Sequence, residues 1–175
     1  MPAASALAER RFWLVKSEPD AFSWQQQVAN GTEPWTGVRN AQAASFLRAM
    51  RRGDRAFFYH SNVGKEIVGV VEVAREAYPD PTEAVPEGRA PRWVCTDMRA
   101  VGPMPRPVPL SAIKAEPALA EIGLIRQSRL SVMPISPEHW ALLCRMGAGR
   151  AEALPAFPGP LPLGCSLRAA RAAGR

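Results

Sequence analysis

The sequence predicts an α+β fold: a small, curled β-barrel of about five or six mostly antiparallel strands with short helices around it. Three observations support this expectation. Apolar β-branched and aromatic residues gather in short runs that turn residues separate. The helical segments are short, and they show no regular β-α-β rhythm. Hydrophobic residues make up 47% of the 175 residues, which is enough for a packed core.

The expected strands are runs rich in Val, Ile, Phe, Tyr and Trp that are bounded by Gly, Pro, Asn or Asp. The run RWVCTDMRAV shows the period most clearly, because its side chains alternate cleanly between two faces. The expected strands cover residues 12–16, 54–60, 66–76, 92–101 and 129–135. We interpret the stretch GPMPRPVP at 102–109 as an extended linker.

The expected helices have recognisable starts. Asp20 or Ser23 can cap the first helix, Asn40 the second and Ser136 the last, because a short polar side chain accepts a hydrogen bond from an unpaired N–H of the first turn. The expected helices cover residues 22–30, 41–52 and 137–146, with short helical turns between 110 and 123.

The chain is expected to hold one folded domain at residues 12–147. We expect residues 1–11 to form a flexible leader and residues 148–175 to form a disordered tail rich in Ala, Pro and Arg. No apolar run approaches the roughly 20 residues of a membrane span, and the start lacks the apolar core of a secretory signal. We therefore expect a cytoplasmic protein without a membrane partner.

The net charge of +6 and the pI of about 9.9 favour polyanions such as nucleic acid. An arginine-rich composition alone produces the same charge. The charge is therefore equally consistent with a basic surface that binds no nucleic acid. The three cysteines show no C-x-x-C spacing, and the two histidines are not spaced as a metal pair. The expectation is therefore no metal and no cofactor.

Four segments at strand ends or in adjoining loops are unusually polar: KSEPD (16–20), WTGVRN (35–40), FYHSN (58–62) and RQSRLSVMP (126–134). In a small barrel, strand ends and their loops form one rim, where pockets lie. If the four segments meet there, they supply an aromatic wall, hydroxyls, an amide and cations. That inventory suits a planar, hydrogen-bonding ligand such as a nucleobase taken out of its stack.

Each of these side chains has an expected role in binding and an alternative, purely structural role. Trp35 or Tyr59 can stack on a base, and Asn40 offers the donor and acceptor that a base edge requires. The hydroxyls of Ser17 and Ser61 can bond exocyclic groups of the base. The cations expected to contact phosphates are Arg39, Arg126 and Arg129. Alternatively, Trp35 fills the core, Asn40 only caps a helix, Arg39 pairs with Glu18 or Asp20, and His60 is a structural hydrogen-bonding group.

These same blocks resemble the EVE domain family. The likeness rests on FWLVKSEPDAFSW, WTGVRNAQAASFLRAMRRGDRAFFYHS, IVGVVEVAREAYPDPT and RQSRLSVMPIS, and it runs from about Phe12 to Gly147. The resemblance implies a PUA-like β-barrel related to YTH and ASCH domains, and binding of DNA or RNA that carries a modified base such as methylated or hydroxymethylated cytosine. It places around that base Lys16, Ser17, Glu18, Trp35, Val38, Asn40, Tyr59, His60, Ser61, Ser128, Leu130 and Ser131.

Other functions have weaker support. The sequence holds no nucleophile elbow and no glycine-rich phosphate loop, so it gives no strong reason to identify an enzyme. The alternative is a small ASCH-like amidohydrolase acting on modified nucleosides with Lys16, Ser17 and Glu18. Lys16 and Ser17 are expected on opposite sides of the first strand, which counts against it. A third hypothesis is an interaction module that uses its proline-rich loops.

Overall fold

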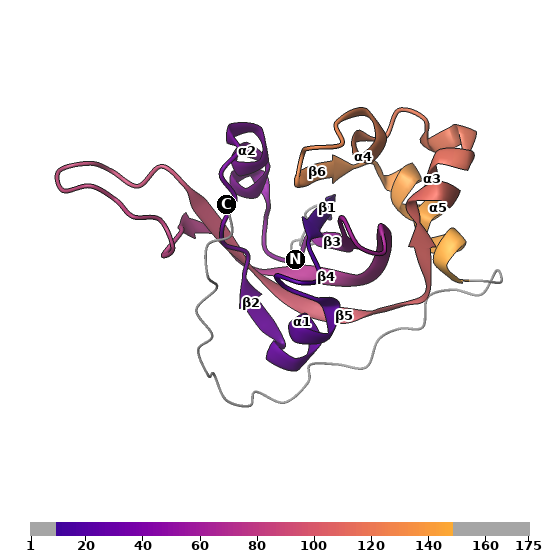
Figure 1. The fold of residues 1–175 in the computed structure, drawn as a ribbon, viewed down its shortest axis with the longest axis horizontal. Helices are drawn as coiled ribbons and strands as arrows, with labels where there is room; N and C mark the ends of the chain where they lie inside the picture. Colours follow the sequence, from indigo (N-terminus) through magenta and orange to yellow (C-terminus); the bar gives the residue numbers. More distant parts are fainter. Residues whose placement is uncertain (1–9, 149–175) are drawn as a thin grey trace, which may run out of the picture.

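A pair of parallel strands organises the sheet. β1 (Phe12–Ser17) and β3 (Arg55–His60) run side by side, with Phe12 opposite Arg55 and Ser17 opposite His60. The computed structural model describes residues 10–148, and within them six strands form one sheet in the order β2-β5-β4-β3-β1-β6 (Figure 1). The remaining strands are β2 (Thr32–Pro34), β4 (Glu66–Pro79), β5 (Val94–Pro109) and β6 (Val132–Ile135).

The prediction of a curled, mostly antiparallel α+β sheet is confirmed, since every strand pair other than β1–β3 is antiparallel. The sheet is not closed into a full barrel, because β2 and β6 are its outer strands. The predicted leader (1–11) and tail (148–175) lie almost wholly outside the described residues.

Residues 102–109 are not a linker but the second half of β5, so the interpretation from sequence is wrong here. Their four prolines occupy alternate positions, and proline cannot donate a hydrogen bond to a ladder. The strand tolerates them because β2 pairs only with residues 97–99 of β5. Beyond that point β5 has β4 alone as a strand neighbour, and prolines are accepted on such an edge.

The hairpin of β4 and β5 carries an extended connection, residues 80–93, that we call the arm. Figure 1 shows it projecting past α2, away from the rest of the molecule. The helices are α1 (Trp24–Asn30), α2 (Ala41–Ala49), α3 (Leu110–Ala115), α4 (Gly123–Arg126) and α5 (Pro137–Ala148), with a short 3₁₀ helix at Pro117–Leu119. None of the helices within the described residues is long and apolar enough to cross a membrane.

The predicted caps are present. The Ser23 side chain accepts from the backbone N–H of Gln26, and Gln26 bonds back to Ser23 to complete a capping box. The Asn40 side chain accepts from the N–H of Ala43 at the start of α2. These caps fix where α1 and α2 begin, and so they fix the loop between them that contains WTGVRN.

Aromatic side chains fill the space between sheet and helices. Phe57 and Phe58 of β3 are fully buried on its two faces. Trp140 of α5 stacks on Phe57, with ring centroids 3.9 Å apart. Trp24 of α1 lies flat over Gly69 of β4, where an added Cβ would come within 2.6 Å of the indole. A residue without a side chain is therefore required at position 69 for α1 to approach the sheet.

Candidate nucleic-acid interface

Three of the four polar segments meet at one end of the sheet. Because β1 and β3 are parallel, their carboxyl ends lie at the same edge. The N–H of Ser61 donates to the carbonyl of Ser17 at 3.0 Å, and the N–H of Lys16 donates to the carbonyl of Ser131 at 2.9 Å. Backbone hydrogen bonds therefore bring together the segments KSEPD, FYHSN and RQSRLSVMP.

The fourth segment reaches this region through Asn40. An open pocket of about 320 Å³ lies between the start of α2 and the connection from α4 to β6, which is within the usual size range of small-ligand sites. Its lining is mostly polar: Asn40, Gln42, Arg126, Gln127, Ser128, Arg129 and Leu130. We call this the α2–α4 pocket. Residues of the WTGVRN and RQSRLSVMP segments both line this pocket, as expected if the polar segments share one rim of the sheet.

Asn40 caps α2 and still has hydrogen-bonding capacity. Its Oδ1 accepts from the N–H of Ala43 at 2.9 Å, whereas its Nδ2 makes no hydrogen bond with the described residues. Gln42 and Gln127 likewise offer side-chain amides without a partner among residues 10–148. Sequence reasoning missed both glutamines. Their positions in the sequence could have identified them, since Gln42 lies in the first turn of α2 and Gln127 lies within the RQS segment.

Lys16 holds one wall of the α2–α4 pocket in place. Its Nζ donates to the carbonyl of Ser128 at 2.8 Å and lies 5.9 Å from the centre of the Tyr59 ring. Burial lowers the pKa of Lys16 and raises the pKa of Tyr59. Tyr59 is almost completely buried, so it supports Lys16 from within the core.

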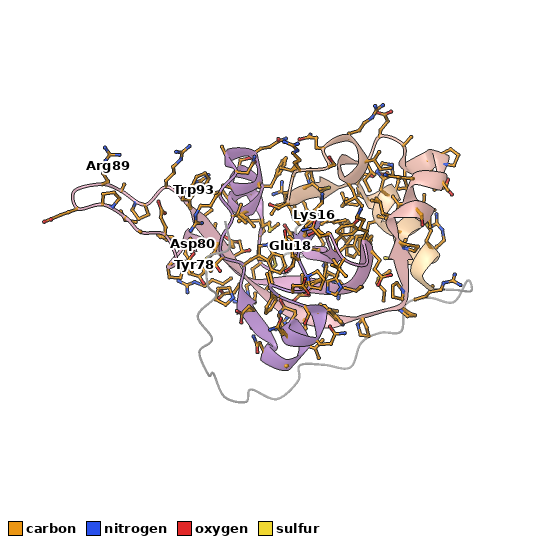
Figure 2. All side chains as sticks on the ribbon, in the orientation of Figure 1. Lys16, Glu18, Tyr78, Asp80, Arg89 and Trp93 are labelled. Carbon is orange, nitrogen blue, oxygen red and sulfur yellow. The ribbon has the colours of Figure 1, made fainter. Side chains whose placement is uncertain are left out.

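Ser17 and Glu18 do not join Lys16 in one reactive group. The hydroxyl of Ser17 is buried and donates to the carbonyl of Phe22 at 2.7 Å. Glu18 is exposed, and its carbonyl accepts from the N–H groups of Ala21 and Phe22 to form a turn. Figure 2 shows Lys16 and Glu18 near the middle of the molecule, at some distance from the arm.

Trp35 lies in the hydrophobic core and does not line the α2–α4 pocket. Only 4% of it is exposed, and its ring packs edge-on against Phe22 and Phe58. Val38 is buried in the same cluster. The core placement that sequence reasoning left open for Trp35 is thus the one observed. A stacking role for its ring stays a prediction.

His60 has a structural hydrogen bond. Its Nε2 accepts from the backbone N–H of Trp24 at 3.0 Å, at the start of α1. Burial lowers the pKa of His60, and the nearby carboxylate of Glu66 opposes this only in part. His60 therefore positions the start of α1, while the neighbouring Ser61 bonds β1 through its backbone.

The three predicted phosphate-binding arginines differ in availability. Arg126 forms an exposed ion pair with Glu121. Arg39 pairs with Asp80 at 2.9 Å, so the alternative pairing with Glu18 or Asp20 is wrong. Arg129 is exposed and has no ion-pair partner within residues 10–148. Of the three, Arg129 is the guanidinium that a phosphate can approach without displacing a carboxylate.

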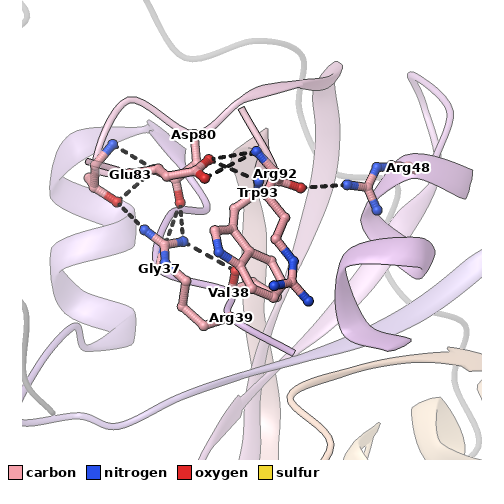
Figure 3. A network of polar contacts seen from close by, with 9 residues as sticks. Gly37, Val38, Arg39, Arg48, Asp80, Glu83, Arg92 and Trp93 are labelled. Carbon is pink, nitrogen blue, oxygen red and sulfur yellow. Dashed lines mark hydrogen bonds and ion pairs between the residues drawn. The ribbon is translucent and has the colours of Figure 1, made fainter. Parts of the chain in front are cut away.

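Asp80 fixes the WTGVRN loop to the base of the arm (Figure 3). Its carboxylate is fully buried and accepts from the N–H of Gly37 at 2.8 Å, from Arg39, and from both the N–H and the hydroxyl of Thr82. Burial by itself raises the pKa of Asp80, but hydrogen bonds from Arg39, Thr82 and Gly37 outweigh it, so the pKa lies below its ordinary value. The loop and the arm therefore form one polar junction.

An open, curled, mixed sheet with short helices and a polar pocket beside its strand ends defines a PUA-type domain. A YTH domain of Zygosaccharomyces rouxii, 15% identical with a TM-score of 0.51, covers 81% of this chain and shares the fold. The EVE domain model matches residues 11–146, and the chain belongs to the EVE family.

Relatives agree with this assignment. Thymocyte nuclear protein 1 of Gallus gallus is 37% identical over an alignment of 157 positions that covers 73% of this chain and 65% of the relative. The chain thus spans about two thirds of that protein's length. A solved structure from Rhodopseudomonas palustris is 56% identical, covers 82% of this chain and 96% of its own, and has a TM-score of 0.74. Human THYN1, solved in complex with DNA containing 5-methylcytosine, is 34% identical, with coverages of 78% and 97% and a TM-score of 0.72.

Proposed function

We propose that this chain is a non-catalytic nucleic-acid-binding domain that takes a modified base, such as methylated or hydroxymethylated cytosine, into the α2–α4 pocket. The observation that carries the proposal is a set of side-chain amide groups around that pocket that have no partner within residues 10–148: the Nδ2 of Asn40 and the amides of Gln42 and Gln127. The family membership and the methylated DNA bound by human THYN1 support it.

The chemistry of the pocket suits the edge of a pyrimidine. The free Nδ2 of Asn40 can donate to a ring nitrogen or carbonyl oxygen, and the amides of Gln42 and Gln127 can donate to and accept from the same edge. Leu130 is the apolar group of the lining, and a methyl group buried against it adds about 0.8 kcal/mol, or about fourfold in affinity. Arg129 is available for an adjacent phosphate.

Two contacts favour binding over hydrolysis. The Nζ of Lys16 is directed to the carbonyl of Ser128, and the hydroxyl of Ser17 to the carbonyl of Phe22. A nucleophile and its base must lie within hydrogen-bonding distance of each other, and these two groups are directed to different partners. The amidohydrolase hypothesis would require the side chains of Lys16 and Ser17 to turn toward the same substrate atom.

The Asn40→Ser variant tests the proposal cleanly. Serine caps a helix about as well as asparagine, so α2 is expected to keep its stability within about 0.5 kcal/mol. Because the Nδ2 donor is lost, affinity for a methylated duplex should fall about tenfold, which corresponds to one hydrogen bond of ~1.4 kcal/mol. Fluorescence anisotropy with a duplex that carries one 5-methylcytosine measures this.

Asn30→Ser is the matched control, since Asn30 lies at the end of α1 and bonds Glu33 outside the pocket. That variant should bind like the parent protein. Equal affinities of the Asn40→Ser and Asn30→Ser variants would show that the α2–α4 pocket does not read the base.

We also propose that the protein acts in the cytoplasm and that RNA with the same modification is an alternative to DNA. The basic charge and the polar pocket support both nucleic acids equally. A panel of single- and double-stranded DNA and RNA, each with and without the modified base and at one stated salt concentration, separates these partners. We keep residues 12–147 as the proposed extent of the domain.

A further inference from the structure

The base of the arm is held rigidly beside the WTGVRN loop. The N–H of Asp80 donates to the carbonyl of Trp93 at 3.0 Å, which closes the arm where it leaves the sheet. The carboxylate of Asp80 binds Gly37 and Arg39 of the loop. Because Arg39 directly precedes Asn40, the arm is tied to the residue that lines the α2–α4 pocket.

Arginine side chains gather around Trp93 at this base. The guanidinium of Arg92 lies 4.7 Å from the centre of the Trp93 ring, and that of Arg39 lies 5.9 Å from it. Arg48, in the last turn of α2, donates to the carbonyl of Arg92 at 2.8 Å. A guanidinium stacked on an aromatic face keeps its N–H groups free along its edge, in the fork that fits a phosphate.

Two of the three carboxylates of the arm, those of Asp80 and Glu83, are turned inward. Asp80 is buried against Arg39, and the carboxylate of Glu83 accepts from the backbone N–H groups of Arg92 and Trp93 (Figure 3). Glu87 is exposed, as are the arginines at 48, 89 and 92, and none of these three has an ion-pair partner within residues 10–148. The surface formed by the arm and the adjoining end of α2 therefore presents three arginines against one exposed carboxylate, that of Glu87.

The helix α2 sets the spacing between this surface and the pocket. Gln42 lines the pocket at one end of α2, and Arg48 contacts the arm at the other. Six residues of helix at 1.5 Å each give about 9 Å. At 3.4 Å per nucleotide, that spacing is about three steps along a strand of duplex.

We propose that Arg48, Arg89, Arg92 and Trp93, which we call the arm patch, form a second nucleic-acid contact that binds the sugar–phosphate backbone about three nucleotides from the base in the α2–α4 pocket. Figure 2 shows Trp93 at the base of the arm and Arg89 farther along it. This inference rests on the proposed function. The contact is independent of sequence and of modification, because phosphates carry no base identity.

Anisotropy titrations with a methylated duplex and its unmodified counterpart, repeated over a series of salt concentrations, test the arm patch. Arg92→Ala should weaken binding of both probes by the same three- to tenfold, and the slope of log affinity against log salt should fall by about 0.9, as for one lost phosphate contact. Trp93→Ala should cause a similar uniform loss without removing a charge, because Arg92 loses the ring that orients it.

Arg145→Ala is the matched control, since Arg145 is exposed on α5, at the opposite end of the molecule from the arm (Figure 1). It should stay within twofold of the parent for both probes. Arg92→Lys keeps the charge and should fall between the parent and Arg92→Ala.

The outcomes separate the two proposals. If the parent prefers the methylated probe while Arg92→Ala behaves like Arg145→Ala, the arm patch is overturned and the pocket stands. If Arg92→Ala changes the ratio between the probes instead of both affinities, the arm reads the base and the backbone contact is wrong. If the parent binds neither probe, the proposed function falls and the arm patch falls with it.

Discussion

Arg39 and Asn40 are neighbours in the chain but belong to polar regions of opposite character. At the junction around Asp80, the side chain of Arg39 is occupied by a fully buried carboxylate and by Thr82. At the α2–α4 pocket, the Oδ1 of Asn40 is bonded and its Nδ2 has no partner among the residues that the structure describes. The comparison shows that a dense polar segment is not one functional unit. The hydrogen bonds of the junction hold the loop and the arm together, whereas at the pocket part of the hydrogen-bonding capacity is unused within residues 10–148.

The largest expected effect tests whether Trp35 belongs to the structural side of this division. Trp35→Ala removes a side chain that is 4% exposed and packs against two phenylalanines. Urea denaturation should show a loss of about 4 kcal/mol in the free energy of unfolding. Trp93→Ala, which truncates a half-buried tryptophan at the arm, should cost less than about 2 kcal/mol. Similar costs for the two variants would contradict the core role of Trp35.

Asp80→Asn should have the next largest effect. The amide replaces an anion that binds Arg39, and it has fewer acceptor sites for Gly37 and Thr82. Because Arg39 is partly exposed, water compensates in part, and a loss of about 2–3 kcal/mol in the free energy of unfolding is expected at pH 7.

The pH dependence of the same variant sharpens this prediction. The pKa of Asp80 is lowered on folding, so its contribution to stability is present above its ordinary pKa of 3.8 and is lost as the pH falls through the lower, folded value. Asp80→Asn should lack this part of the acid sensitivity. Glu87→Gln, which removes an exposed carboxylate of the arm, should unfold like the parent; an equal loss in both variants would argue against the junction.

The smallest expected effect is at His60, which ends β3 and contacts the start of α1. Folding lowers its pKa below 6.5, so the unfolded chain binds more protons there, and stability rises with pH between the folded value and 6.5. His60→Gln keeps an acceptor for the Trp24 N–H and should remove this slope. Thermal melts between pH 5 and 8 measure the difference. An unchanged slope would mean that His60 does not carry the pH dependence.

Much of the fold could be predicted from local patterns. The caps at Ser23 and Asn40 set the starts of α1 and α2, and runs of β-branched and aromatic residues located most strands. The prolines of residues 102–109 misled the prediction, because whether a strand tolerates proline depends on whether a second strand lies beside it. β2 is only three residues long, which is too short to show the alternating pattern of a strand in the sequence.

The meeting of the polar segments was predictable from the sequence, whereas the partners of individual side chains were less so. The polar strand ends indicated where segments meet, and Asn40, Ser128, Arg129 and Leu130 do line one pocket. The partner of Arg39 lies 41 residues away on the arm, and no local signal identifies it. Gln42 and Gln127 carry residue types that are common on any surface, so only the three-dimensional arrangement reveals them.

The bond between Lys16 and Ser128 spans 112 residues of chain. During synthesis, β1 and its neighbour β3 leave the ribosome long before β6 exists, so the outer edge of the apolar strand β1 stays unpaired while the residues between β3 and β6 are made. The α2–α4 pocket is accordingly among the last features of residues 10–148 to form. A polypeptide released before Val132 would hold both parallel strands and the arm, yet it would still lack the β6 strand that anchors the wall against which a base could rest.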